Sequence, residues 1–319
     1  MKKQFSEALL ACNVLSFGKT HDTYNEIELG DEILEPSYLV MLAAFINKHK
    51  VNKKKIKCPL PETQAYLDEI GFGGADLAST QHNHHSGKNH SMLTLLDSED
   101  ATDAANQQII SYISQFTEYA STEGINSLKE VIGELHDNIW AHGKATGYSM
   151  VQLYQSPYQD EIVFAVADCG IGFLAELKRV GIEGIDDDEA AIRWCLEKGN
   201  SSKKVEAAKL DDWTQQLPPD VIGNPMRGIA KYQKSNNHAG LGLGKLVDLV
   251  RYYKGEMDVV SGKKQLSINS DGTRITNLPG WDGWQGVAIC IRLNYTGLRQ
   301  AQATEDAADI DAMLKELTL

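Results

Sequence analysis

Hydrophobic positions in the middle of the chain follow the periods of regular secondary structure. The segments "GYSMVQLYQ" at 147–155 and "EIVFAVA" at 161–167 are short and apolar, and they predict neighbouring strands joined by a turn containing Pro157. Ahead of them, residues 103–120 and 122–142 are typical of two long helices. The centre of the chain therefore combines helices with a sheet.

The first quarter of the chain predicts a strand, a helix, a strand and a helix. Residues 23–29 alternate as a strand does, and residues 36–50 form an amphipathic helical pattern with Pro36 at its start. A second strand is predicted at 54–60 and a second helix at 61–72. Elements in this order require a covered sheet, so we expect a small α/β unit here.

The order of elements predicts an α+β protein built from two units. A small α/β unit and a polar loop occupy residues 1–91, and a larger unit that opens with a strand at 92–96 occupies residues 92–298. Inside the larger unit, the connection at 173–239 is long for a compact domain, and such connections are often functional lids. The end of the chain, residues 299–319, predicts an acidic amphipathic helix.

Composition and charge narrow the class of protein. The 319 residues carry a formal net charge of −13, which argues against a nucleic-acid groove or an anionic membrane as the main partner. No apolar run is long enough to span a membrane, and Glu7 and Asn13 interrupt the apolar stretch near the start, so we expect no signal peptide. The five cysteines form no CxxC pair and are typical of free thiols in a reducing cytoplasm. We therefore expect a cytoplasmic protein.

A polar face lies on the helix predicted at 122–142. Glu134, Asn138 and His142 follow one another at intervals of four residues and therefore share one face of this helix. Apolar neighbours give the same helix a buried side. By itself such a face is more often solvated than functional.

Two glycine-containing segments follow further along the chain. "DCGIG" at 168–172 ends the strand "EIVFAVA" with an acid and two glycines. "GLGLG" at 240–244 opens a helix whose free backbone amides are suited to phosphate oxygens. The candidate ligand-binding residues in and beside these segments are Asp168, Gly170, Gly172, Gly240, Leu241, Gly242, Gly244 and Lys245.

Together the three segments resemble the motifs of the GHKL ATPase superfamily, which includes gyrase, heat-shock chaperones, MutL and histidine kinases. The resemblance covers about residues 115–298 and is closest to histidine-kinase-like and anti-sigma-factor serine kinase ATPase domains. It implies a Bergerat α/β sandwich, in which helices cover one face of a mixed, mainly antiparallel sheet. It also implies that ATP and Mg²⁺ are the ligands.

The resemblance gives the polar motif residues distinct roles. Asn138 would hold Mg²⁺ through its amide oxygen, because this ion prefers hard oxygen ligands. Glu134 would be the catalytic residue, polarising an attacking water or a substrate hydroxyl within hydrogen-bond reach. Asp168 would accept a hydrogen bond from the adenine amino group and thereby select adenine over guanine.

The glycines would let backbone approach the nucleotide where a side chain would collide. Gly170 and Gly172 would lie against the purine, and the glycines of 240–244 would let the lid close over the phosphates. The strand "GVAICIRL" at 286–293 would close the sheet behind the adenine.

Two basic side chains allow two interpretations each. His142 stands near the phosphates in the resemblance, and it is equally compatible with a structural helix histidine. Lys245 follows the glycine turn, where it would either touch phosphate or point outward.

The N-terminal unit loosely resembles STAS domains, the anti-anti-sigma-factor fold. That family carries an acid and a phosphorylatable serine where its main helix begins, and Glu35 and Ser37 stand near that place here. The alternative is that Ser37 is an ordinary first-turn helix residue, and we favour it because serine is common there.

These features predict a protein that binds Mg-ATP or ADP and regulates a protein partner through lid closure. The γ-phosphate would be lost by slow hydrolysis or transferred to a serine of a protein. The alternative is a protein-binding module that nucleotide merely stabilises, and the presence of Glu134 argues against it. A homodimer is compatible with the resemblance, whereas a nucleic-acid clamp is disfavoured by the acidic composition.

Overall fold

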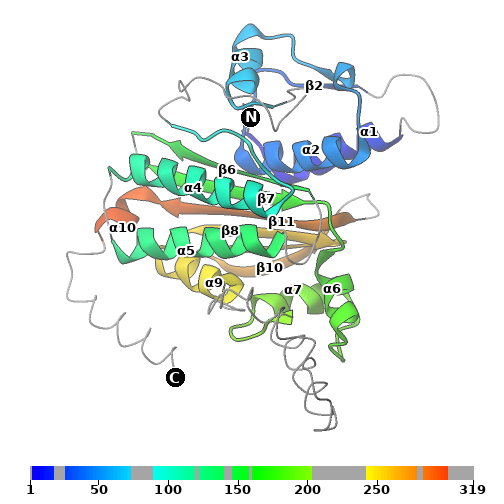
Figure 1. Ribbon diagram of the computed structural model, residues 1–319, viewed down its shortest axis with the longest axis vertical. Coiled ribbons are helices and arrows are strands. Elements are labelled where there is room, and N and C mark those ends of the chain that lie inside the picture. The colour runs from blue at the N-terminus through cyan, green and yellow to red at the C-terminus, as the bar shows by residue number, and fades with distance from the viewer. Residues whose placement is uncertain are drawn as a thin grey trace, which may run out of the picture.

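The centre of the molecule is a seven-stranded sheet with the strand order β10-β9-β8-β11-β7-β6-β5 (Figure 1). The computed structural model describes residues 2–17, 26–72, 89–118, 122–139, 146–157, 160–202, 242–278 and 283–300. The strands of the sheet are β5 (Thr94–Leu96), β6 (Gly147–Tyr154), β7 (Glu161–Asp168), β8 (Glu256–Gly262), β9 (Lys264–Asn269), β10 (Gly272–Asn277) and β11 (Trp284–Asn294). All neighbouring strands pair antiparallel. The protein is therefore α+β, as predicted, but the expectation of a mixed sheet is wrong for these strands.

The central strands are apolar on both faces. In β7, Ile162, Phe164 and Val166 belong to one hydrophobic cluster, whereas Val163 and Ala165 belong to another. Successive strand residues point to opposite faces, so the two clusters lie on opposite sides of the sheet. A strand of this kind needs a cover on both sides.

Helices cover the first face, which carries Phe164. The helices are α4 (Glu99–Phe116), α5 (Glu123–Asn138), α7 (Asp188–Leu196), α9 (Gly242–Tyr252) and α10 (Tyr295–Gln300), and Figure 1 shows α4, α5 and α9 running along the sheet. Side chains cap α4 and α5, since Ser98 accepts a hydrogen bond from the amide of Ala101 and Thr122 from that of Ile125. The helices predicted at 103–120 and 122–142 are thus confirmed as α4 and α5; α4 ends at Phe116, and residues 140–142 lie outside the described ranges.

Two N-terminal helices, α1 (Phe5–Phe17) and α2 (Pro36–His49), cover the second face. Ten successive residues of α2, Pro36 to Phe45, are buried, because the sheet lies on one side of the helix and α1 on another. A helix that is apolar all round is typical of such an internal layer. The helix predicted at 36–50 is confirmed, but the expectation of helices on one face of the sheet only is wrong.

The remaining N-terminal elements are short and lie outside the large sheet. Strand β1 (Lys2–Lys3) pairs parallel with β3 (Ile33–Leu34), and β2 (Ile27–Glu28) pairs parallel with β4 (Ile56–Lys57). A 3-10 turn at Lys53–Lys55 precedes β4, and α3 (Pro61–Glu69) follows it. The buried residues of α1 and α2 share one hydrophobic cluster with those of β6, β7 and β11. The expected boundary at residue 91 therefore does not separate two hydrophobic cores.

The segment expected to be a lid begins with ordered helices. Within 173–239, α6 (Gly172–Val180) and α7 account for most of the first thirty residues, and residues 203–239 lie outside the described ranges. The predicted C-terminal helix also lies mostly outside them, because the description ends with α10. None of the helices in the described ranges is long and apolar enough to cross a membrane.

A buried ion pair ties the start of α2 to the sheet. Nη2 of Arg292 in β11 donates to both carboxylate oxygens of Glu35, at 2.9 and 2.8 Å, and Nη1 donates to Glu161 at 2.8 Å. The Glu35 side chain is 1% exposed and that of Arg292 13%. Removing one member of such a pair leaves an uncompensated buried charge.

Replacing Arg292 by Met should therefore destabilise the protein by about 3–5 kcal/mol in urea unfolding, because Glu35 would stay buried without its cation. Adding Glu35→Gln should recover part of that loss. Arg193→Met removes an exposed pair with Glu189 and serves as the control, with an expected change below about 0.5 kcal/mol. Equal losses for Arg292→Met and Arg193→Met would contradict this account.

Candidate functional site

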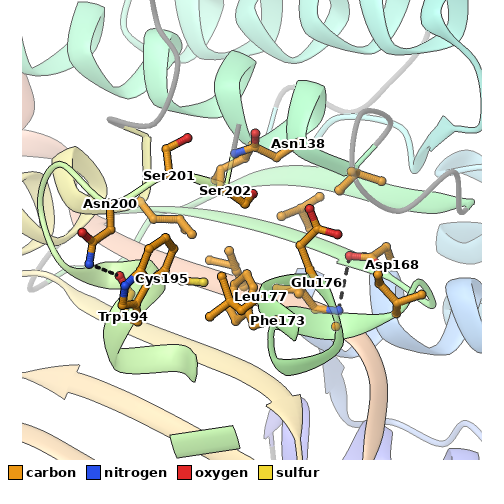
Figure 2. A pocket seen from close by; sticks show the side chains of 18 residues that line it. Asn138, Asp168, Phe173, Glu176, Leu177, Trp194, Cys195, Asn200, Ser201 and Ser202 are labelled. Atoms are coloured by element: carbon orange, nitrogen blue, oxygen red, sulfur yellow. Dashed lines mark hydrogen bonds between the residues drawn. The ribbon is translucent and has the colours of Figure 1, made fainter. Parts of the chain in front are cut away.

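A cleft lies between α5, the end of β7, and helices α6, α7 and α9 (Figure 2). Most of the wall is apolar: Leu135, Ile139, Val166, Ile171, Phe173, Leu177, Trp194, Leu243, Val287 and Ile289. Its polar side chains are Asn138, Asp168, Glu176, Asn200, Ser201 and Ser202. A few polar groups in an apolar wall are typical of a site that binds one small ligand in a fixed orientation.

Helix α5 brings Asn138 to the cleft. Asn138 is the last residue of α5 and lines the cleft, and the half-buried Glu134 stands one turn earlier on the same helix face without lining it. The start of the helix is anchored, because the Thr122 hydroxyl donates to the carbonyl of Leu298 at 2.6 Å. His142, the third residue of the predicted face, lies outside the described residues.

Asp168 ends β7 and enters the cleft opposite α5. The amide of Gly170 donates to its Oδ1 at 2.6 Å, and the amide of Val287 donates to its Oδ2 at 3.3 Å (Figure 2 draws the latter). Asp168 is only 6% exposed, and this burial raises its pKa to about 6, against the opposing effects of the two amides and of the positive charge on Lys48. At neutral pH the side chain is therefore an ionised, oriented hydrogen-bond acceptor in an apolar wall.

A bulge in β11 makes room for this carboxylate. The register of β11 shifts between Trp284 and Val287, and Gly286 between them has φ of +119°. A Cβ on Gly286 would lie 2.2 Å from the carbonyl oxygen of Asp168, a separation that no side chain permits. Trp284 Nε1 also donates to that carbonyl, at 3.0 Å. Strand β11 thus holds both the backbone and the side chain of Asp168.

The loop after Asp168 is also supported from the second face of the sheet. Nζ of Lys48, near the end of α2, donates to the carbonyl of Cys169 at 2.6 Å. The Cys169 thiol is buried, and burial, followed by the nearby Asp168 charge, raises its pKa to about 12. Cys169 is therefore a packing residue rather than a nucleophile.

The two glycines of "DCGIG" serve different purposes. Gly170 orients Asp168 through its amide and does not line the cleft. Gly172 lines the cleft, has φ of +77°, and would place a Cβ 3.1 Å from the Ser261 hydroxyl oxygen. That hydroxyl accepts from the amide of Phe173 and donates to the carbonyl of Gly286, so Ser261 joins the start of α6 to the bulge.

The "GLGLG" segment reaches the cleft through one side chain. Gly242 and Gly244 lie in the first turn of α9, and Leu243 between them lines the cleft. Gly244 lets α9 approach the turn after α7, because a Cβ there would lie 3.1 Å from Cα of Lys198. The Nζ atom of Lys245 pairs with Glu130 of α5 at 2.8 Å and does not line the cleft, which favours the outward interpretation. Gly240 and Leu241 lie outside the described residues.

The cleft also contains residues that no motif indicates. Glu176 belongs to α6, Trp194 to α7, and Asn200 to the turn after it, where its amide donates to the Trp194 carbonyl at 3.1 Å. Helix α6 had a signal in the sequence, since Phe173, Leu177 and Val180 repeat at helical spacing. Nothing in the sequence shows that α6 and α7 face α5, because that is decided by packing.

Comparison of the chain with models of known protein families found no match, and no curated protein matches it either. Among the described residues, no group of three or more His, Cys, Asp or Glu side chains is arranged to hold a metal ion. Each of the three motifs contributes a lining residue to the cleft: Asn138, Asp168 and Leu243. The proposal of a function therefore rests on the three motifs and on the cleft that they line.

Replacing Gly286 by Ala should destabilise the protein through a clash with the backbone of Asp168. Gly272→Ala is a matched control, since Gly272 has a similar φ of +124° but no atom within 4 Å of an added Cβ. We expect the backbone strain to cost about 1–3 kcal/mol in both variants. The clash should add about 1–3 kcal/mol in Gly286→Ala alone, measured by urea unfolding. Equal losses would show that the bulge is not needed for close approach.

The pH dependence of stability should report the buried carboxyl of Asp168. The pKa of Asp168 is about 6 in the folded protein, whereas an Asp carboxyl exposed to water has a pKa near 3.8, so between these two pH values the folded state binds a proton that the unfolded state does not. Stability should therefore rise as pH falls through 6, by up to about 1.4 kcal/mol per pH unit. From pH 7 to pH 5, the wild type should gain about 1 kcal/mol relative to Asp168→Asn in urea unfolding. Parallel profiles of the two proteins would contradict a raised pKa.

Proposed function

We propose that this protein binds Mg-ATP in the cleft between α5 and the end of β7, as a GHKL-type ATPase unit, and regulates a protein partner. The observation that carries this proposal is that Asn138 and Asp168, thirty residues apart in sequence, line one cleft from opposite sides. The layer of α4, α5 and α9 on one face of the sheet supports the proposal, although the wholly antiparallel pairing differs from the mixed sheet that the resemblance implies. The layer of α1 and α2 on the second face departs from it.

The Asp168 end of the cleft suits adenine. Its carboxylate is ionised at neutral pH and fixed by two amides, which leaves acceptor capacity for an amino group of the base. Guanine would present a carbonyl where adenine presents the amino group, and two acceptors would then face each other. The apolar side chains of Phe173 and Leu177 offer a wall for a flat ring.

The Asn138 end suits the metal and the phosphates. The amide oxygen of Asn138 is a hard ligand on the cleft side of α5, and Mg²⁺ typically takes one or two protein oxygens and completes its shell with phosphate and water. Bound there, Mg²⁺ would offset the negative charge of the triphosphate. Glu134 stands one turn earlier on the same face of α5, and its proposed role is to order a water beside the metal.

The acceptor of a transferred phosphate, if there is one, should be another protein. Ser37 is 2% exposed and lies in the first turn of α2, on the face of the sheet opposite the cleft. A serine there cannot meet the γ-phosphate while α2 covers the sheet. The packing of α2 thus favours an ordinary structural role for Ser37 and directs transfer, or the signal of slow hydrolysis, to a separate partner.

The second candidate function is a protein-binding module that nucleotide stabilises without turnover. The position of Glu134 outside the cleft lining is the observation that favours it. Turnover decides between the two candidates.

Nucleotide binding is tested by the thermal unfolding of the protein with ATP, ADP and GTP, with and without Mg²⁺. At a hundredfold excess over the dissociation constant, ATP with Mg²⁺ should stabilise by about 2.7 kcal/mol, and GTP should stabilise less. Asn138→Ala should remove the Mg²⁺-dependent part, whereas Lys245→Met should not, because that side chain pairs with Glu130. No stabilisation by any adenine nucleotide would overturn the proposal.

Catalysis is tested by release or transfer of label from γ-labelled ATP. We expect Glu134→Ala to lower the rate by about 10²–10⁴, the usual contribution of a general base. Unchanged turnover in Glu134→Ala, or none in the wild type despite ATP binding, would establish the binding module instead.

A further inference from the structure

Helix α6 places a buried carboxylate in the cleft that the proposed chemistry does not use. The Glu176 side chain is 8% exposed and lines the cleft, whereas its partner Arg179 is 48% exposed. Removing a carboxylate from water costs free energy, and an ion pair confined to a helix surface would not require it. Glu176 is therefore a buried acidic group in the wall of the cleft, where it can contact a ligand.

Arg179 fixes the orientation of this carboxylate. Its Nε and Nη2 atoms donate to the two oxygens of Glu176 at 2.8 and 2.9 Å, in a bidentate pair. Because Arg179 lies three residues further along α6, the pair does not join α6 to another element. An ionised carboxylate accepts about four hydrogen bonds, so the bidentate pair with Arg179 does not by itself use all its lone pairs.

Figure 2 shows the Glu176 carboxylate pointing into the space between Asp168 and Asn138. In the proposed arrangement these two residues mark the base end and the phosphate end of the nucleotide. Phosphate oxygens would be repelled by a second carboxylate. The part of a nucleotide that lies between base and phosphates and carries hydrogen-bond donors is the ribose, with its 2′ and 3′ hydroxyls.

We propose that Glu176, oriented by Arg179, accepts hydrogen bonds from the ribose hydroxyls and makes the cleft selective for ribonucleotides over deoxyribonucleotides. Acidic side chains bind ribose diols in this way in other nucleotide sites. The assignment rests on the proposed function, because it takes the base to be at Asp168 and the phosphates at Asn138.

The test compares the dissociation constants of ATP, 2′-deoxyATP and 3′-deoxyATP, each with Mg²⁺, by calorimetric titration. The wild-type protein should prefer ATP to at least one deoxy analogue by about tenfold to a hundredfold, the usual effect of one hydrogen bond to a charged group. Glu176→Met should bind all three with nearly equal affinity, and Glu176→Gln, which keeps the shape and loses the charge, should reduce the preference to a few-fold. Each preference is a ratio on one protein, so any loss of stability cancels.

Glu189→Met is the matched control. Glu189 pairs with Arg193 four residues further along α7 and does not line the cleft, so its loss should leave the preference for ATP unchanged. A wild-type protein that binds ATP and both deoxy analogues equally would overturn the ribose assignment and leave ATP binding intact. A Glu176→Met protein that keeps the full preference for ATP would also overturn the ribose assignment without contradicting ATP binding. A wild-type protein that binds none of the three would overturn the proposed function itself.

Discussion

The apolar character of both faces of β6, β7 and β11 is the constraint on which the rest of the structure depends. Each face has to be kept from water, so one layer of helices is not enough. Helices α4, α5 and α9 cover the first face. Helix α2, itself packed against α1, covers the second. The N-terminal segment is therefore part of the core of the sheet, and the pair of Arg292 with Glu35 holds it in register.

The cleft is a consequence of how this sheet ends. Where β7 stops at Asp168, the bulge in β11 brings Gly286 against its backbone, and the amides of Gly170 and Val287 turn its side chain towards α5. Lys48 reaches the same loop from α2, on the other side of the sheet. The layer that covers the second face thus also supports the loop of the candidate site.

Two carboxylates in the cleft limit where each part of the proposed ligand can lie. Asp168 is held by backbone amides and buried at the sheet end, and Glu176 is held by a guanidinium on α6. Phosphate groups would be repelled by both, so the triphosphate of the proposed ligand would point towards Asn138, where the proposed Mg²⁺ would offset its charge. The charge pattern alone therefore favours one direction for a nucleotide in the cleft.

The sequence by itself determined the local elements and the local chemistry. Apolar runs and caps specify β6, β7, α2, α4 and α5, and the spacing of Glu134 and Asn138 specifies one face of a helix, because these features depend on neighbours within a few residues. Only the tertiary structure decided that α2 covers the sheet, that β11 bulges at Gly286, and that Glu176 turns into the cleft while Lys245 turns towards Glu130. Those outcomes depend on contacts between residues far apart in the chain, and no local period encodes which buried surface a given element will meet.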